Sequence, residues 1–101
     1  MDYAIEAAGD VARVKLSGRL TFKDHRAYRD LLTELLGHKA KSYEIDLSGV
    51  EHIDSAGIGM LMISKQKAEA ADGKVVLVAP PPTVKRVLEV AKIDEILDIR
   101  D

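Results

Sequence analysis

The alternation of apolar and polar residues near the start of the chain predicts a β-hairpin. Apolar and polar side chains alternate over residues 3–7 and again over residues 13–17, and Gly9-Asp10 stands between the two stretches. A period of two residues is typical of a strand with one buried face, and a Gly-Asp pair fits the turn of a hairpin. We therefore expect two antiparallel strands, the second of which ends at Gly18.

The period then changes to about 3.6 residues, which indicates amphipathic helices. The first helix covers residues 27–36 and ends before a glycine. Either Thr21 or Asp24 caps its start, in an acidic variant of the capping box. The second helix covers residues 56–71. The third follows three consecutive prolines, and Thr83 is in position to cap it.

Three further strands are expected between and after these helices. Residues 43–47 form a short strand that ends at Ser48-Gly49, and residues 74–79 form an apolar strand of the kind that is buried on both faces. A short last strand covers residues 96–99. The order β-β-α-β-α-β-α-β predicts an α/β fold with a mixed, mostly parallel sheet of four to five strands covered by helices. A chain of 101 residues is expected to form a single domain, residues 1–101.

Composition and charge narrow the class of function. The chain has 15 basic and 17 acidic residues and no basic cluster, so it lacks the electrostatic footprint of a nucleic-acid-binding protein. It has no cysteine, which excludes disulfides and thiolate zinc sites. The histidines lie in three separate segments, at His25, His38 and His52. Since metal-ligand spacing, nucleotide-binding loops and catalytic motifs are all missing, we expect no metal, no cofactor and no enzymatic activity.

The apolar content does not favour export or membrane insertion. The first residues include acidic side chains and no continuous apolar run, which does not fit a signal peptide. The longest apolar stretch, residues 56–63, is far shorter than the roughly 20 residues that cross a bilayer as a helix. We expect a cytoplasmic protein without direct membrane insertion.

The junction between the 43–47 strand and the second helix is the first candidate for a functional site, because functional groups collect where strands end and helices begin. Ser55 stands there, as the N-cap or within the first turn. A helix N-terminus stabilises an adjacent anion, so the position suits a phosphoserine, although Asp-Ser before a helix is also ordinary capping chemistry. Gly57 and Gly59 permit the close approach of another backbone, supplied either by a partner or by tight packing on the sheet.

The same segment resembles a known family. Residues 46–50 read Asp-Leu-Ser-Gly-Val and residues 53–59 read Ile-Asp-Ser-Ala-Gly-Ile-Gly, which resembles the STAS domain of bacterial anti-sigma-factor antagonists. In that family the motif serine is phosphorylated by an anti-sigma factor that is itself a serine kinase. The unphosphorylated antagonist binds the anti-sigma factor and frees the sigma factor. The resemblance implies that Ser55 is the phosphoacceptor, that the partner kinase holds ATP, and that a phosphoserine phosphatase resets the switch.

The resemblance also implies a partner-binding surface around the phosphoacceptor. We expect it to comprise Asp54, Ser55, Ala56, Gly57, Gly59, Met60, Thr21 and Phe22. Many relatives have an aspartate and small residues where this chain has residues 21–25, so this loop bears on which partner is bound. Phe22 is the only phenylalanine and is either a docking residue or a hydrophobic staple.

Two alternatives share these general features. An accessory STAS subunit of an ABC-type membrane transport complex would have much the same sequence and would act as a structural or regulatory part without phosphorylation. A phosphoaspartate receiver domain is also a small α/β switch, but it needs an acid cluster after its first strand, and residues 14–18 supply none. Asp46 alternates with inward-facing neighbours and is expected to point to the other face of the sheet or to the strand end.

Overall fold

The computed structural model describes residues 1–101 and contains five strands, three α-helices and two short 3-10 helices. In chain order these are β1 (Asp2–Ala8), β2 (Val11–Leu20), η1 (Phe22–Asp24), α1 (His25–Leu36), β3 (Ser42–Ile53), α2 (Ser55–Ala70), β4 (Lys74–Val78), α3 (Pro82–Val90), η2 (Ile93–Glu95) and β5 (Asp98–Arg100). This order confirms the predicted α/β fold.

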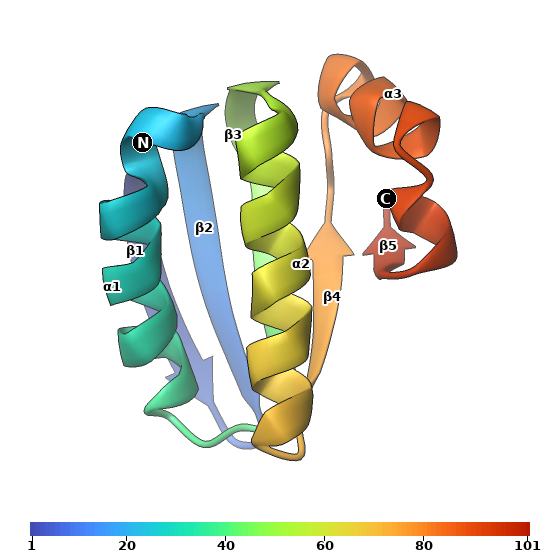
Figure 1. Ribbon diagram of the computed structural model, residues 1–101. Coiled ribbons are helices and arrows are strands. Elements are labelled where there is room, and N and C mark those ends of the chain that lie inside the picture. Colours follow the sequence, from blue (N-terminus) through green and yellow to red (C-terminus); the bar gives the residue numbers. More distant parts are fainter.

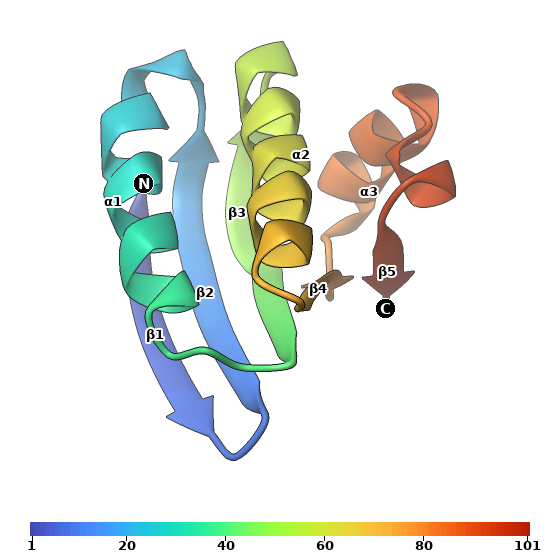
Figure 2. The same cartoon turned by 60° about the horizontal axis from the view of Figure 1, so that its bottom comes forward.

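The strands form one mixed sheet in the order β1-β2-β3-β4-β5. β1 pairs antiparallel with β2, and the other three pairs are parallel. From β2 to β5, each new parallel strand lies next to the previous one, and the sheet always grows in the same direction. Right-handed crossovers therefore place α1, α2 and α3 on the same face of the sheet. Figures 1 and 2 show α1 and α2 side by side across that face, with α3 towards β4 and β5.

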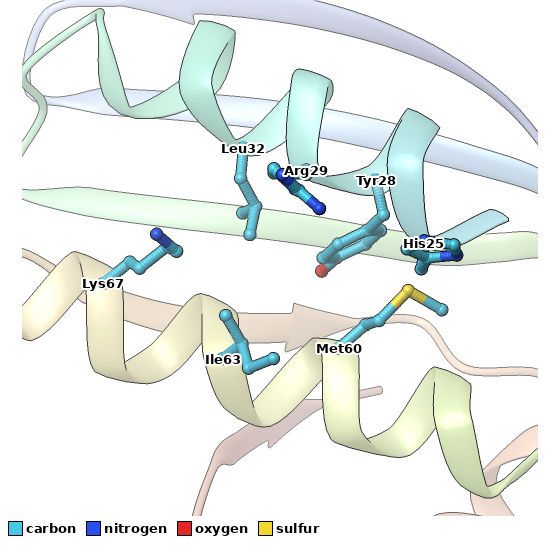
Figure 3. Close-up of a pocket in the computed structure, with 7 residues that line it drawn as sticks. All are labelled: His25, Tyr28, Arg29, Leu32, Met60, Ile63 and Lys67. Carbon is cyan, nitrogen blue, oxygen red and sulfur yellow. The ribbon is translucent and has the colours of Figure 1, made fainter. Parts of the chain in front are cut away.

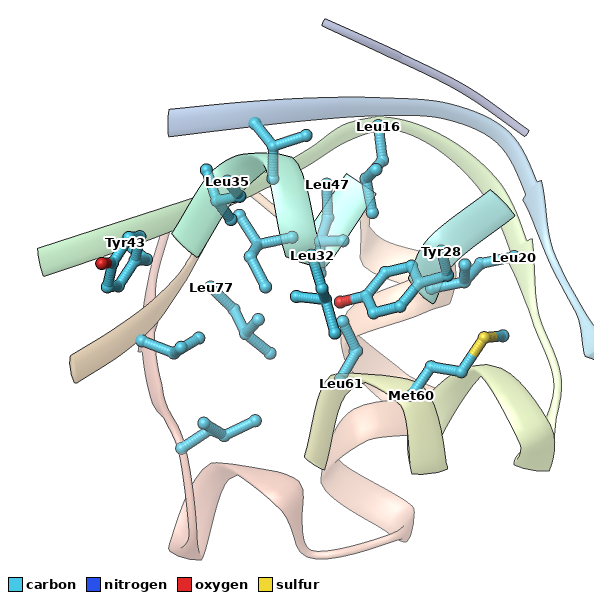
Figure 4. Close-up of a cluster of buried hydrophobic side chains, with 14 of the residues drawn as sticks. Leu16, Leu20, Tyr28, Leu32, Leu35, Tyr43, Leu47, Met60, Leu61 and Leu77 are labelled. Carbon is cyan, nitrogen blue, oxygen red and sulfur yellow. The ribbon is translucent and has the colours of Figure 1, made fainter. Parts of the chain in front are cut away.

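Side chains from this face of the sheet and from the inner sides of the helices form one hydrophobic core of 23 buried residues. β2 contributes Ala12, Val14 and Leu16, all fully buried and spaced by two as a half-buried strand requires. Leu35 of α1 and Leu61 of α2 belong to the same cluster (Figure 4). Burying one such leucine stabilises the fold by about 1.5 to 3 kcal/mol, so the core holds both helices on the sheet.

The opposite face of the sheet carries a set of ion pairs. Arg13 lies 3.0 Å from Glu44 and 3.8 Å from Asp46, and Arg100 lies 2.8 Å from Glu44. Asp46 is only 8% exposed and also accepts the Ser48 N–H at 2.9 Å. Its carboxylate therefore points away from the core, as its alternation with buried neighbours predicted.

Two strands run further than predicted. β2 continues past Gly18 to Leu20, because the glycine takes a φ of 88° at a register shift instead of ending the strand. β3 continues past Ser48-Gly49 to Ile53, since pairing with β2 resumes beyond each of two register shifts. The predicted ends at Gly18 and at Ser48-Gly49 are therefore wrong, and both strands reach the edge of the sheet where Ser55 lies.

Thr83 does not cap the third helix. α3 begins at Pro82 with Pro81 as its N-cap, so Thr83 lies within the first turn. Proline suits this place because its fixed φ is helical and its missing N–H would have had no helical partner. The last strand covers Asp98–Arg100 rather than residues 96–99, because Ile96 closes the preceding 3-10 turn.

Candidate functional site

The ends of β2 and β3 bring the two predicted site segments together. Leu20 and Ile53 are the last residues of these parallel strands and are paired in register. The Asp54 N–H donates to the Leu20 carbonyl at 3.3 Å, which extends the pairing by one bond. Because the carboxyl ends of parallel strands meet at one edge of a sheet, the loop that starts at Thr21 and the helix that starts at Ser55 lie beside each other.

Asp54 is the N-cap of α2 and links the helix to the neighbouring loop. One carboxylate oxygen, Oδ1, accepts the Gly57 N–H at 2.8 Å, and the other, Oδ2, accepts the Phe22 N–H at 3.2 Å. The bond from Gly57 is the main reason why the pKa of Asp54 lies below its ordinary value; desolvation opposes it, and the bond from Phe22 adds to it. An ionised Asp54 therefore fills the capping role at neutral pH.

Ser55 is the first residue of α2, and its side chain is exposed. It lies in the first turn and is not the N-cap, which settles the two placements that the sequence left open. Since Asp54 accepts the capping bond, the Ser55 hydroxyl is not needed for it. The helix dipole supplies about half a positive charge at this end. An accessible hydroxyl at a positively polarised helix entrance is chemically suited to carry a phosphate.

The loop before α1 is held by the carboxylate of Asp24. Its Oδ2 accepts the Thr21 N–H at 2.9 Å and the Thr21 hydroxyl at 3.2 Å, so Asp24 reaches back to Thr21 as in a capping box. Burial raises the pKa of Asp24, but the bond from the Thr21 N–H leads the contributions that outweigh it, and the pKa is lowered overall. The loop beside Ser55 is thus fixed by hydrogen bonds.

Phe22 lies on the outside of this loop and is 66% exposed. Its ring stacks on His25 with the ring centroids 5.0 Å apart. A hydrophobic staple would instead bury Phe22 against an apolar residue of the first helical turns. The staple alternative is therefore wrong, and Phe22 is accessible to another protein.

The two glycines of α2 have different surroundings. Gly57 is buried, and a Cβ at this position would collide with the Leu20 carbonyl and lie 2.7 Å from Cγ1 of Ile53. Gly57 therefore lets α2 pack tightly against the ends of β2 and β3. A Cβ at Gly59 would meet nothing within 4 Å, so packing on the sheet does not require this glycine.

The eight predicted contact residues differ in accessibility. Phe22 and Ser55 are exposed, and Gly57 and Met60 are buried. The other four are half-buried, namely Thr21, Asp54, Ala56 and Gly59. The accessible part of the predicted surface is therefore the loop after β2 together with the outer side of the first turn of α2.

A groove beside Ser55 was not predicted. It has a volume of about 370 Å³ and lies between the start of α2 and α3, with Ile58 on one side and Val87 and Val90 on the other. Val90 is 76% exposed, and Arg86 also lines the groove. One feature of the sequence pointed to this groove: Val90 is apolar but lies outside the buried stripe of α3. Whether Val90 lines a groove depends on where α3 packs, which the sequence does not show. Ser55 thus stands at the edge of an apolar surface.

The structure brings no group of three or more potential metal ligands together. None of its helices combines the length and the apolar character that a membrane-spanning helix needs.

Residues 3–98, which include both site segments, match the protein family described as "Mlab, STAS domain". The chain belongs to the STAS domain family. The resemblance carried by residues 46–59 is thereby confirmed. A STAS-domain containing protein of Pseudomonas aeruginosa is 25% identical to this STAS domain over 93 residues, which cover 92% of this chain and 91% of that protein.

Solved structures of anti-sigma factor antagonists have the same fold. A candidate anti-sigma factor antagonist from Thermotoga maritima is 26% identical, with a TM-score of 0.87 over 98% of this chain and 86% of that chain. SpoIIAA of Bacillus, an anti-sigma factor antagonist, has a structure in its phosphorylated form. That structure has a TM-score of 0.71 at 17% identity and covers 97% of this chain and 90% of that chain.

The fold also occurs outside the antagonists. A sulfate transporter family protein from Wolinella succinogenes has a TM-score of 0.78 at 17% identity, over 91% of this chain and 77% of that chain. At this identity the likeness shows a shared fold.

Proposed function

We propose that this STAS domain protein is a non-enzymatic anti-sigma factor antagonist. Its unphosphorylated form binds an anti-sigma factor and releases a sigma factor, and phosphorylation of Ser55 by a partner serine kinase turns binding off. The observation that carries the proposal is the exposed Ser55 hydroxyl at the start of α2, left free of the capping role by Asp54. The antagonists among the structural neighbours support a protein partner of this kind.

Electrostatics indicate that the phosphate would leave the fold intact. A phosphoserine carries about −1.5 to −2 charges at neutral pH. An anion at an exposed helix N-terminus is stabilised by roughly 0.3 to 1 kcal/mol. The adjacent Asp54 carboxylate repels the phosphate, but it is already compensated by two N–H donors. The switch would therefore act at the surface of the partner and not through unfolding.

If Ser55 lies at the centre of the interface with the partner, a phosphate on it would weaken binding strongly. A charge buried in an interface without a cation opposite costs about 3 to 5 kcal/mol. Since about 1.4 kcal/mol corresponds to a factor of ten, the affinity would fall by roughly a hundredfold to several thousandfold. Such a factor separates a bound from an unbound state without any conformational change in this protein.

The remaining partners follow from the chemistry. This chain has no nucleotide-binding loop, so the kinase would hold the ATP and this protein would present only a hydroxyl. A phosphoserine phosphatase would restore the binding form. The proposal assigns the protein to the bacterial cytoplasm and involves no nucleic acid, cofactor or membrane insertion by this chain.

An accessory subunit of an ABC-type membrane transport complex is the second candidate. It is kept because the same fold occurs in the sulfate transporter family protein from Wolinella succinogenes. In this role a similar surface would bind a transporter ATPase, and Ser55 would stay unmodified.

A pull-down of the tagged protein from its native cell, with mass spectrometry of the Ser55 peptide, tests both candidates. We expect an anti-sigma protein to co-purify with the wild type and with Ser55→Ala, and the wild-type peptide to carry phosphate. Ser48→Ala changes another exposed serine and should behave like the wild type. Capture of a transporter ATPase with unmodified Ser55 would transfer the assignment to the second candidate. Phosphate linked to Asp46 with Ser55 unmodified would contradict both.

A further inference from the structure

A crevice between α1 and α2 is not used by the proposed switch. It has a volume of about 400 Å³ and opens to solvent between the two helices (Figure 3). Its apolar floor consists of Tyr28 and Leu32 from α1 and Met60 from α2, which are 2%, 3% and 7% exposed. Ile63, 45% exposed, forms one wall. The molecule therefore displays an apolar trough between two helices that are otherwise packed on the sheet.

The rim of this crevice is cationic. Arg29 lies on the α1 side and Lys67 on the α2 side, and His25 lies beside Met60 near one end (Figure 3). None of these three forms one of the protein's salt bridges. No acidic side chain lines the crevice, although the chain as a whole has a formal net charge of −2. The rim is thus a cationic region on an acidic protein.

The polar groups beneath the crevice are already satisfied. The Ser64 hydroxyl donates to the Met60 carbonyl at 2.9 Å, so the Tyr28 hydroxyl is the donor in its bond to Ser64. No buried side-chain nitrogen or oxygen in the protein lacks a partner. No buried polar side-chain atom of the floor therefore needs a ligand as its partner, and the charged side chains available for recognition are Arg29 and Lys67 at the rim.

We propose that this crevice, defined by the seven lining residues in Figure 3, is the docking groove for an acidic amphipathic helix of the partner protein. An apolar side chain of that helix fills the floor, and its flanking carboxylates pair with Arg29 and Lys67. This is the helix-in-groove mode of recognition, with charge complementarity setting the choice of partner. The inference rests on the proposed function, since it names the chemistry of the same partner.

The dimensions and position of the groove fit this occupant. Its lining residues extend over residues 25–32 of α1 and 60–67 of α2. Seven residue steps at 1.5 Å each span about 10 Å, or two turns of a docked helix. His25, at one end of the groove, stacks on Phe22, whose N–H donates to Asp54, so this end of the groove lies next to the loop beside Ser55. An open crevice at the small end of the usual range of roughly 300 to 1,000 Å³ does not enclose a lipid chain.

Two synthetic helical peptides of about 15 residues provide the probe, with leucine on one face and either glutamate or lysine elsewhere. Nuclear magnetic resonance titration of the nitrogen-15-labelled protein follows their binding. We expect the glutamate peptide to shift the amides of residues 25–32 and 60–67, and the lysine peptide to leave them unchanged. The apparent affinity should fall roughly fivefold between about 50 and 300 mM salt, because exposed ion pairs are screened.

Charge reversal identifies the residues responsible. Arg29→Glu with Lys67→Glu should lower the affinity for the glutamate peptide about tenfold or more. Arg26→Glu with Lys41→Glu makes the same charge change at two exposed residues outside the crevice, and it should retain wild-type affinity. Equal binding of both peptides, shifts elsewhere on the protein, or an equal loss in the control pair would overturn the proposal. Binding of phosphatidylglycerol vesicles while both peptides remain silent would also overturn it, in favour of a membrane surface.

The experiments distinguish failure of the docking groove from failure of the phosphorylation switch. The peptide titration contains no kinase and no variant of Ser55, so a negative result there leaves the phosphorylation switch standing. Conversely, if the partner binds the protein with phosphorylated and with unmodified Ser55 equally well, the proposed switch is wrong and the proposed docking groove is unaffected.

Discussion

The carboxylate of Asp54 accepts the backbone N–H of Phe22 at 3.2 Å, across 32 positions of the sequence. This bond joins the exposed phenylalanine of the loop after β2 to the start of the helix that presents Ser55. Because the same carboxylate caps α2, the loop and the helix entrance form one hydrogen-bonded unit. The proposed partner surface is thus pre-organised by the residue that precedes the phosphoacceptor.

Replacing Asp54 should loosen this unit without unfolding the protein. Asp54→Ala removes the cap and the link to Phe22, and the free energy of unfolding should fall by about 0.5 to 2 kcal/mol. Urea denaturation measures this change. Hydrogen exchange at the Phe22 and Gly57 amides should accelerate, since both lose their acceptor. Asp30→Ala, at an exposed position of α1, is the control and should alter neither quantity. Unchanged exchange at Phe22 would mean that the link does not exist in solution.

Alanine at the two glycines of α2 should have opposite effects on stability. Gly57→Ala places a Cβ against the Leu20 carbonyl, and overpacking of this kind costs about 1 to 3 kcal/mol. Gly59→Ala meets no neighbour within 4 Å and should gain up to about 1 kcal/mol of helix propensity. Thermal denaturation of both variants compares them directly. Destabilisation by Gly59→Ala similar to that of Gly57→Ala would contradict the geometry.

The hydrogen bond between Tyr28 and Ser64 ties α1 to α2 and should show strong coupling. Ser64→Ala leaves the buried Tyr28 hydroxyl without its acceptor, at a cost of about 1 to 3 kcal/mol. Tyr28→Phe leaves Ser64 bonded to the Met60 carbonyl and should cost only about 0.5 to 1.5 kcal/mol. The double variant should lose less than the sum of the two single losses. Additive losses in urea denaturation would show that the two hydroxyls do not interact.

Acid should destabilise the protein through four carboxylates. Asp24, Glu44, Asp46 and Asp54 all have pKa values lowered by the folded structure. On acidification these groups bind protons in the unfolded chain at a higher pH than in the folded protein. The stability that they contribute at higher pH is therefore lost as the pH falls through their folded-state pKa values. Unfolding free energies from urea titrations should be constant between about pH 5 and pH 8 and decline below about pH 4. Asp54→Asn should flatten part of this slope, and stability that rises on acidification would contradict the account.

Periodicity was sufficient to predict the order of elements, because alternate burial of residues such as Val14 and Leu16 follows directly from the strand geometry. It could not locate the strand ends. Ser48-Gly49 is a typical turn sequence taken alone, yet pairing with β2 carries β3 on to Ile53. The length of β3 is set by its pairing with β2, and a local sequence pattern contains no information about that pairing.

The sequence placed Ser55 at the helix start but could not say which side chain capped it. That depends on the direction of the Asp54 carboxylate towards the Gly57 N–H. The two glycines also look alike in sequence, and only contact with Leu20, from a distant strand, distinguishes Gly57 from Gly59. The contact surfaces of a helix are set by tertiary packing, which the local sequence does not contain.

Isothermal titration calorimetry of the partner with this protein, carrying either unmodified or fully phosphorylated Ser55, measures the effect of the phosphate on affinity. We expect phosphorylation to lower the affinity for the partner by about a hundredfold or more, with the folded structure retained. Ser55→Ala should keep the full affinity, and Ser55→Asp should lower it. Equal affinities for the phosphorylated and unmodified proteins would contradict the account.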